Sequence, residues 1–417
     1  MSNGNEYGCS CTRRDFMKHS AAAIGAGMML PAFLRETDVA MAANALAGNS
    51  QAHPERVLVV LELSGGNDGL NTVIPYSNDD YYRARPTIGI RPNNLRKLND
   101  DFGFHNNLPG WERLFKDGNM AVVHGCSYPN PNRSHFESMK FWHTGVPNAP
   151  ESRGWLGRFA DTYQPEAVSS YMINVAKEQS LAVGANIHSP VVFKDPERFG
   201  RQGSPEEREL FKELAQKRTR EWNPSLEFVR GIASTAESSS EFIRHSCAEY
   251  KTQADYGYGD IGLDMKKIVA LIGADSPARI FYTKFGSFDT HVSQANAHSG
   301  LFNQAGDAVH AFFKDLERIG RAQDVSLLIF TEFGRRVQEN ASKGTDHGVA
   351  SPMFIVGNDI KGGFYSEHPS LTDLDEGDLK MTTDFRKVYA TMTKEWMGFQ
   401  DTQSLLRQEF ETLGVFT

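Results

Sequence analysis

The chain has 417 residues, of which 40% are hydrophobic and 23% charged, and its formal net charge is −8 at pH 7. This balance is typical of a globular protein, and an acidic chain without a basic tract argues against nucleic acid or anionic membranes as partners. The length exceeds a typical single core, so we expect one large domain with insertions or two lobes.

The first residues have the order of an export signal. Arg13 and Arg14 form an arginine pair, residues 21–34 are an apolar stretch, and Ala40-Met41-Ala42 supplies a small-x-small cleavage pattern. The apolar stretch is too short to span a bilayer and contains a proline, so no stable membrane span is expected. The segment resembles a twin-arginine signal. We therefore predict a signal peptide at 1–42, recognition by the twin-arginine translocation machinery, and a periplasmic or secreted protein.

Cysteine usage gives no disulfide framework. Cys9 and Cys11 would leave with the signal peptide, and only Cys126 and Cys247 would remain. Small secreted domains need several bridges for such a framework. One bridge between the two is possible in an oxidising compartment, and two separate buried thiols are the favoured alternative.

Five short apolar runs predict the strands of a buried sheet. They cover residues 56–63, 120–125, 278–284, 325–330 and 353–357. Runs without polar alternation are typical of strands buried on both faces of a parallel sheet. Helical patterns lie between them, at residues 111–115, 205–222, 226–250 and 295–320. The alternation predicts an α/β fold with a doubly wound, mainly parallel central sheet and helices on both faces.

The segment from 196 to 260 differs from the rest. It is charged, has long helical patterns and lacks a clear strand. We interpret it as a helical insertion or cap over the sheet, within one α/β domain that covers residues 43–417.

Polar side chains gather at the ends of the predicted strands, after four of them and before the fifth. In open parallel sheets, functional groups collect at the edge formed by the carboxyl ends of the strands. The candidate residues, in chain order, are Asn67, Asp68, Arg133, Ser134, His135, Asp289, His291, Glu332, Arg335, Asp346 and His347.

Each of these residues also has an ordinary structural explanation. Asn67-Asp68-Gly69 is a common turn, and Glu332 could form an ion pair with Arg335. Ser134-x-x-Glu137 is a capping box, in which the serine hydroxyl and the glutamate bond the first backbone N–H groups of a helix. The functional interpretation therefore depends on the residues meeting in one place.

If the strand assignments hold, three carboxylates, two histidines and one serine meet at one edge of the sheet. Such a set suits divalent ions such as Zn²⁺ or Mn²⁺, and two ions could share it. A metal-bound serine hydroxyl at a helix N-terminus loses its proton readily and can attack phosphorus or sulfur. The helix N-terminus and Arg133 would hold the remaining anionic oxygens.

Five motifs follow the leader in the order of a known family. They read SGGNDGLNTVIPY, PNRSHFES, FDTHVSQ, TEFGRR and GTDHG. With them the chain resembles a widespread bacterial family of exported proteins of unknown function, itself similar to the alkaline phosphatase and sulfatase superfamily. The resemblance covers essentially the whole chain after the leader. It implies the doubly wound α/β fold of that superfamily.

The resemblance also implies roles for single residues. Ser134 lies where the superfamily has its nucleophile, with Arg133 beside it. Asp68 resembles the carboxylate that binds one metal ion, and Asp289 and His291 resemble the pair that binds the other. His347 resembles the final histidine ligand. The implied cofactor is one or two divalent ions, with Zn²⁺, Mn²⁺ and Ca²⁺ as candidates.

The chain departs from the superfamily at Glu332-Phe333, where an adjacent Asp-His pair is usual. Glu332 can replace the aspartate, whereas Phe333 cannot coordinate a metal. His135 or Asp346 would have to compensate, and Asn67 and Arg335 remain supporting candidates. Otherwise that metal site is weakened or absent.

Three functions are compatible with these residues. The preferred one is an exported metal-dependent hydrolase of phosphate or sulfate esters with Ser134 as nucleophile. The second is a non-catalytic relative that binds glycans or a cell-surface partner, which Phe333 and the short Asp289-x-His291 spacing favour. The third, a metal-free Ser-His-Asp esterase, is disfavoured because the chain lacks a G-x-S-x-G elbow.

Overall fold

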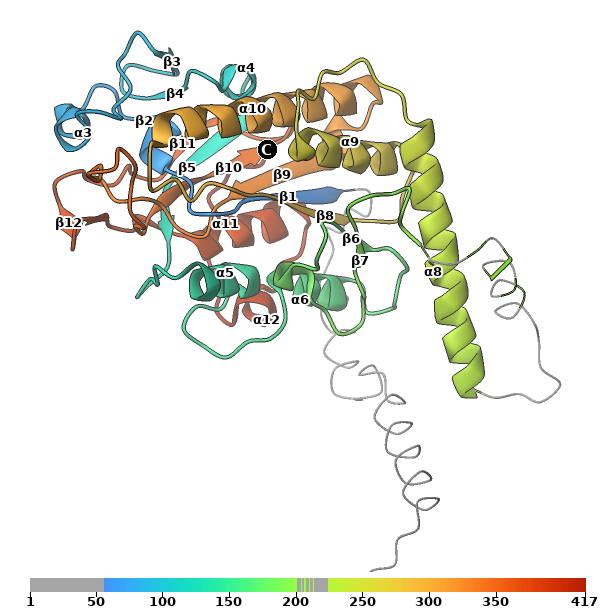
Figure 1. The fold of residues 1–417 in the computed structure, drawn as a ribbon. Helices are drawn as coiled ribbons and strands as arrows, with labels where there is room; N and C mark the ends of the chain where they lie inside the picture. Colours follow the sequence, from blue (N-terminus) through green and yellow to red (C-terminus); the bar gives the residue numbers. More distant parts are fainter. Residues whose placement is uncertain (1–55, 201–203, 205, 208–209, 211–212, 214–223) are drawn as a thin grey trace, which may run out of the picture.

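The computed structural model describes residues 56–417 except 201–203, 205, 208–209, 211–212 and 214–223 (Figure 1). The predicted signal peptide and most of the predicted helix at 205–222 lie outside the described residues. Within the described part, a nine-stranded sheet runs through the molecule with helices on both faces. The α/β prediction is confirmed.

The central sheet has the strand order β11-β5-β10-β9-β1-β8-β6-β7, and β14 also pairs with β5. All five predicted strands are present and form its middle. The strands are β1 (Val57–Leu63), β5 (Met120–Ser127), β6 (Met172–Val175), β7 (Val191–Phe193), β8 (Ile280–Phe285), β9 (Val325–Phe330), β10 (Ser351–Val356), β11 (Gly363–Tyr365) and β14 (Thr383–Asp384). β1 is parallel to both of its neighbours, so Val59 lies opposite Phe281 on one side and Leu327 on the other.

One predicted strand runs against the others. β10 pairs antiparallel with both β5 and β9, where the sequence predicted parallel neighbours. The reversal places the start of β10, rather than its end, at the edge where β5 and β9 end. Residues 344–348, which precede β10, therefore reach the same edge as the residues that follow β1, β5, β8 and β9.

Helices cover both faces of this sheet. In Figure 1, α4, α9 and α10 lie on one face, and α5, α6 and α11 on the other. The predicted helices at 111–115, 226–250 and 295–320 correspond to α4, α8 and α10. The α-helices are α3 (Asp79–Ala84), α4 (Pro109–Lys116), α5 (His135–Thr144), α6 (Trp155–Tyr163), α8 (Pro224–Glu249), α9 (Asp260–Gly273), α10 (Gln294–Arg318), α11 (Phe385–Thr391) and α12 (Thr402–Leu406).

Smaller elements surround the central sheet. A three-stranded sheet has the order β2-β4-β3, and β12 pairs with β13. Their bounds are β2 (Val73–Ile74), β3 (Leu95–Lys97), β4 (Gly103–His105), β12 (Leu374–Asp375) and β13 (Asp378–Leu379). Short helical turns are η2 (Gly69–Asn71), η3 (Leu181–Val183), η4 (Ala322–Asp324) and η5 (Met392–Trp396).

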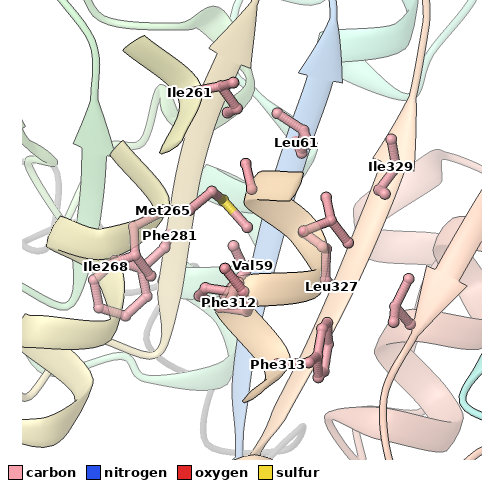
Figure 2. Packing of buried hydrophobic residues seen from close by; sticks show 14 of the residues in the cluster. Val59, Leu61, Ile261, Met265, Ile268, Phe281, Phe312, Phe313, Leu327 and Ile329 are labelled. Atoms are coloured by element: carbon pink, nitrogen blue, oxygen red, sulfur yellow. The ribbon is translucent and has the colours of Figure 1, made fainter. Parts of the chain in front are cut away.

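The apolar run of β1 is explained by burial on both faces. Val59 and Leu61 point into the core beneath α9 and α10, where Met265 and Phe312 pack (Figure 2). Leu58 and Val60 enter the core on the opposite face. A strand with two buried faces needs no polar alternation, which is the pattern that the sequence shows.

The described part of the predicted insertion at 196–260 is mainly helical. Helix α8 contacts α9, and Figure 1 shows most of its length extending away from the sheet. It does not lie over the sheet as a cap in this structure. The assignment of 196–260 as an insertion within one domain stays a prediction.

The two remaining cysteines are separate thiols. Cys126 is buried in β5 and Cys247 is half-buried in α8, and neither forms a disulfide within the described residues. Among those residues, none of the helices combines the length and apolarity needed to cross a bilayer.

One buried and one half-buried histidine should make the fold sensitive to acid. The rings of His124 and His368 lie edge to face, with centroids 5.1 Å apart. Burial lowers the pKa of His124 to about 3 and that of His368 to about 4. In an unfolded chain a histidine titrates near pH 6.5. As the pH falls from 6.5 the unfolded state therefore binds protons first, and the folded state loses stability until about pH 3–4.

We expect the free energy of unfolding to fall below pH 6.5, with a slope approaching roughly 1.4 kcal/mol per pH unit for each of these histidines. The substitution His124→Phe removes one of the two contributions. It keeps a ring that can stack on Phe364, as His124 does at an interplanar angle of 9°. Denaturant unfolding at pH 7, 6 and 5 measures the slope. Identical slopes for the variant and the parent would contradict the assignment.

Candidate metal centre

Two glycines let separate loops approach each other at the carboxyl edge of the sheet. Gly65, directly after β1, has a φ of +118°, and a Cβ there would lie 2.6 Å from the backbone nitrogen of Asp289. A Cβ on Gly344 would lie 2.2 Å from the carbonyl carbon of His291. Only residues without a side chain fit at these contacts. The loops after β1 and β8 and before β10 are thereby held together.

The carboxylate of Asp289 is surrounded by imidazole nitrogens. Its Oδ1 lies 3.0 Å from Nε2 of His291 and 3.1 Å from Nε2 of His347. Its Oδ2 lies 3.6 Å from Nε2 of His135. Ligand-type atoms of His135, Asp289 and His347 all lie within 4.8 Å of one another. The three histidines thus direct the same nitrogen toward one carboxylate.

The opposite nitrogen of each ring is held by an oxygen. Nδ1 of His135 lies 2.8 Å from Oε1 of Glu332. Nδ1 of His291 lies 3.4 Å from Oδ1 of Asp346, and Nδ1 of His347 lies 3.0 Å from the carbonyl oxygen of Arg133. Metal-binding histidines almost always have such a partner, because it fixes the tautomer and leaves Nε2 as the ligand atom.

The donor atoms fit a divalent ion. Nε2 of His291 and Nε2 of His347 are 3.0 Å apart, close to the roughly 3.3 Å between two ligands of a tetrahedral Zn²⁺. Nε2 of His135 is buried and has no hydrogen-bond partner among the described residues. An unpaired buried nitrogen costs free energy unless something binds it. Three imidazoles and one carboxylate suit Zn²⁺ or Mn²⁺.

The electrostatics of the cluster keep Asp289 ionised. Burial opposes its ionisation, but the interactions with Arg335 and His347 outweigh burial and lower the pKa of Asp289 to about 2. Burial lowers the pKa of His347, which favours its neutral, ligand-competent form. The hydrogen bond with Glu332 raises the pKa of His135.

Arg335 binds the loops that carry the cluster. Its side chain is fully buried and donates to Oδ1 of Asp289 at 2.6 Å. It also donates to the carbonyl oxygens of Gly65, Gly66, Phe288 and Thr345. One guanidinium therefore joins all three loops, and the predicted supporting role of Arg335 is structural.

Glu332 and Asp346 lie behind the histidines rather than among the ligands. Oε1 of Glu332 accepts hydrogen bonds from the backbone nitrogen of Gly65 at 2.9 Å and from His135. Its side chain is 1% exposed. The sequence predicted Glu332 as a ligand and His135 as a support, whereas in the structure His135 is the residue that faces Asp289 and Glu332 lies behind it. The reason is that α5 starts at His135 and directs its ring toward Asp289.

Phe333 lies beneath the same rings. Its centroid is 4.8 Å from that of His135 and 4.8 Å from that of His347, and the residue is buried. A phenyl ring therefore fills the position beside the cluster where the superfamily pattern would place a histidine ligand.

The structure does not bring Asp68 and Asn67 into the cluster. Asp68 is fully buried and pairs with Arg85 at 2.6 Å, and its Oδ2 also accepts from Gln294. Asn67 is held by Thr72 and by His298. Both side chains therefore contact residues of α10, Gln294 and His298. The prediction of Asp68 as a ligand is therefore not supported by its position.

Ser134 is exposed and occupies the N-cap position of α5, but its hydroxyl makes no capping bond. The backbone nitrogen of Ser134 is instead bonded to Oδ1 of Asn132 at 2.7 Å. The capping-box prediction was right about where the helix begins and wrong about the bond. The Arg133 guanidinium faces Asp378 and Glu376, so it is already paired rather than free to hold an anion.

A cavity of about 540 Å³ opens beside the cluster. Its walls include three residues that the sequence reasoning missed, Glu62, His143 and Tyr282. The available signal was Glu62 itself, the polar residue inside the apolar run of β1.

The fold and this cluster define an α/β protein with a candidate centre of three histidines and one aspartate at the carboxyl edge of its sheet. Residues 55–409 match the family described as "Protein of unknown function (DUF1501)", and the chain belongs to that family. This confirms the predicted membership of a family of unknown function. No curated protein matches the chain by sequence.

Several solved structures are similar to the fold at low sequence identity. The lipoteichoic acid synthase LtaP from Listeria monocytogenes is 10% identical, with a TM-score of 0.37 over 82% of this chain and 81% of that chain. The C-terminal periplasmic domain of EptC from Escherichia coli is 10% identical, with a TM-score of 0.37 over 87% and 90%. A Vibrio parahaemolyticus protein of the alkaline phosphatase superfamily is 10% identical, with a TM-score of 0.33 over 79% and 70%.

Proposed function

We propose that this protein is an exported metal-dependent hydrolase of phosphate or sulfate esters, with Ser134 as its nucleophile. The observation that carries the proposal is the orientation of the three histidines. Each Nε2 faces Asp289, while each Nδ1 is held by an oxygen. The arginine pair at Arg13 and Arg14 supports export.

His135, Asp289, His291 and His347 would hold the ion. Such an ion, when bound, supplies Lewis-acid stabilisation of negative charge on the ester group. Arg335 keeps Asp289 ionised and in place, while Glu332 and Asp346 orient two of the rings. The carbonyl oxygen of Arg133 orients the third ring, that of His347, and so links it to the residue that precedes Ser134.

Ser134 lies between two residues linked to the centre, since the carbonyl of Arg133 contacts His347 and His135 is itself a candidate ligand. The first backbone N–H groups of α5 are unpaired donors of the kind that bind anions. In the proposed reaction the Ser134 oxygen bonds to phosphorus or sulfur while the bond to the ester oxygen breaks. The proton that the hydroxyl loses balances the proton that the leaving oxygen takes up to become the alcohol. Water then releases the phosphate or sulfate from the serine.

Substitution of Ser134 by alanine tests this role. We expect hydrolysis of aryl phosphates or aryl sulfates to fall at least about 100-fold, because the covalent route is lost, while the metal content stays the same. Ser152→Ala, at another exposed serine, is the matched control and should keep full activity. Unchanged turnover in Ser134→Ala would remove the serine from the mechanism.

A non-catalytic binding protein for glycans or a cell-surface partner is the second candidate. Phe333, packed against two of the histidines, favours it, because it fills a place where a second ion would need a ligand. Protein purified without metal, and glycan binding that survives Asp289→Ala, would support this alternative over the hydrolase.

A further inference from the structure

The cavity beside the centre is larger than the reacting group requires. Its volume is about 540 Å³, and Asp289, His135 and Glu332 line one part of it. A phosphate or sulfate group takes the space of a few water molecules, at about 30 Å³ each. Most of the cavity therefore remains for the alcohol portion of an ester.

A buried polar group forms another part of the wall. Oε2 of Glu62, on the central strand, accepts a hydrogen bond from the Tyr282 hydroxyl and lies 2.8 Å from Nε2 of His143. Both of these contacts are made by Oε2, which leaves Oε1 as the oxygen that a ligand in the cavity can reach. Burial opposes ionisation of Glu62, but the hydrogen bond with His143 outweighs it and lowers its pKa. Burial raises the pKa of Tyr282, so the tyrosine stays a donor.

A carboxylate in the middle of this strand needs an explanation. Glu62 is 2% exposed and its neighbours in β1 are all apolar. Burying a charge costs free energy, even when it is paired, and an apolar side chain of similar size would suit the strand at least as well. The partners of Glu62 among the described residues are His143 and Tyr282, and not the histidines of the centre. A ligand that donates a hydrogen bond to its free oxygen accounts for its presence.

The remaining walls restrict what that ligand is. Phe136, on the first turn of α5, is 89% exposed and lines the cavity with Met139 and Leu181. Such a ring offers a flat apolar surface that is not used inside the protein. Lys140 and Lys284 line the cavity together with the carboxyl groups of Glu62, Glu178, Asp289 and Glu332. The two ammonium groups are the part of this wall that attracts an anionic substituent. Aromatic walls with a few placed polar groups are typical of small-molecule sites.

We propose that this cavity binds the alcohol portion of the ester as a polyhydroxylated, sugar-like group. Glu62, held by His143 and Tyr282, accepts a hydrogen bond from a ring hydroxyl, and Phe136 lies against the apolar face of the ring. The lysines attract the anionic substituent toward the neighbouring histidines. This inference rests on the proposed function, since it names the substrate class of the same site.

Ligand-observed NMR titrations of the full protein test the proposal. The probes are glucose 6-sulfate and glucose 6-phosphate, each paired with methyl sulfate or methyl phosphate, which carry the same anion without a sugar. We expect the sugar esters to bind at least about tenfold more tightly than the methyl esters, because only they reach Glu62 and Phe136. Equal affinities would overturn the proposal.

Three variants test whether Glu62 and Phe136 cause the difference in affinity between the sugar esters and the methyl esters. Glu62→Gln and Phe136→Ala should each remove most of the tenfold margin while binding of the methyl esters persists. Leu263→Ala, at another exposed apolar residue on α9, should leave the margin intact. If Glu62→Gln fails to fold, Phe136→Ala decides, because its side chain contributes little to the core. If Phe136→Ala keeps the tenfold preference for sugar esters, the proposed contact between the Phe136 ring and the sugar is wrong.

The same titrations separate this proposal from the hydrolase. A tenfold sugar margin in a protein that holds no metal and hydrolyses nothing would support the cavity and refute the proposed reaction. Hydrolysis by a protein that binds sugar esters and methyl esters equally well would support the proposed reaction and refute the sugar site.

Discussion

Asp289→Ala is expected to abolish metal binding and to lower ester hydrolysis at least about 1000-fold. Asp289 contacts Nε2 of all three histidines, so its removal leaves their ring nitrogens without a shared anion. Loss of an outer partner typically costs roughly 10–100-fold in metal affinity or activity, and loss of a ligand costs more. Elemental analysis of protein purified from cells measures the first effect, and turnover of an aryl ester measures the second. Treatment of the parent protein with a chelator should reproduce both losses.

Substitutions of two other aspartates should have smaller effects on metal binding and turnover than Asp289→Ala. Asp346→Ala removes the oxygen behind His291 and should weaken metal binding by roughly 10–100-fold. Asp373→Ala, at an aspartate that is 73% exposed and paired with Lys380, is the control and should change neither quantity. A full equivalent of metal in Asp289→Ala would show that the histidines bind without it, and the centre would have to be reassigned.

The strands of the fold were predictable because of a local property. A strand buried on both faces must be apolar throughout, so Val57–Leu63 and Val325–Phe330 can be recognised without knowing their neighbours. The direction of β10 was not predictable, since no feature of the strand itself distinguishes the two directions. Its reversal nevertheless preserved the site, because the motif of Asp346 and His347 precedes the strand instead of following it.

The candidate site was predictable as a region but not as a ligand set. Asp289, His291 and His347 meet because their loops share one edge of the sheet. Whether His135 or Glu332 faces the centre depends on where α5 begins. If the helix began one residue earlier or later, a different side chain would point toward Asp289, and the sequence does not fix this start to within one residue. Glu62 escaped notice because it lies within a strand, whereas the motifs lie beyond the ends of strands.

The buried ion pair of Asp68 and Arg85 could not be predicted from the sequence. The two residues are 17 positions apart, and Arg85 reaches Asp68 from the end of α3. Burial opposes ionisation of Asp68, but the adjacent guanidinium outweighs it and lowers its pKa. Oδ1 of Asp68 is buried without a hydrogen-bond partner among the described residues. The ion pair and the ligand role implied by the resemblance therefore make different predictions for the same substitution.

Asp68→Ala is expected to lower the free energy of unfolding by about 3–5 kcal/mol, because it leaves the buried charge of Arg85 without a partner. The folded fraction should still bind metal, as Asp68 does not contact the histidines of the centre. Denaturant unfolding and elemental analysis of the same preparation measure the two effects. Loss of the metal with only a small change in stability would restore Asp68 as a ligand.

Two controls separate the ion pair from a general effect of removing an aspartate. The double substitution of Asp68→Ala with Arg85→Leu should recover much of the lost stability, because a buried pair can be replaced by apolar groups at little cost. Asp80→Ala breaks a pair with Arg83, whose side chain is 68% exposed, and exposed pairs contribute only about 0–1 kcal/mol. If the double variant is no more stable than Asp68→Ala, the cost does not arise from an unpaired charge. The oxygen atoms of Asp68 would then have to be explained by a ligand that they bind, and a second ion would be the first candidate.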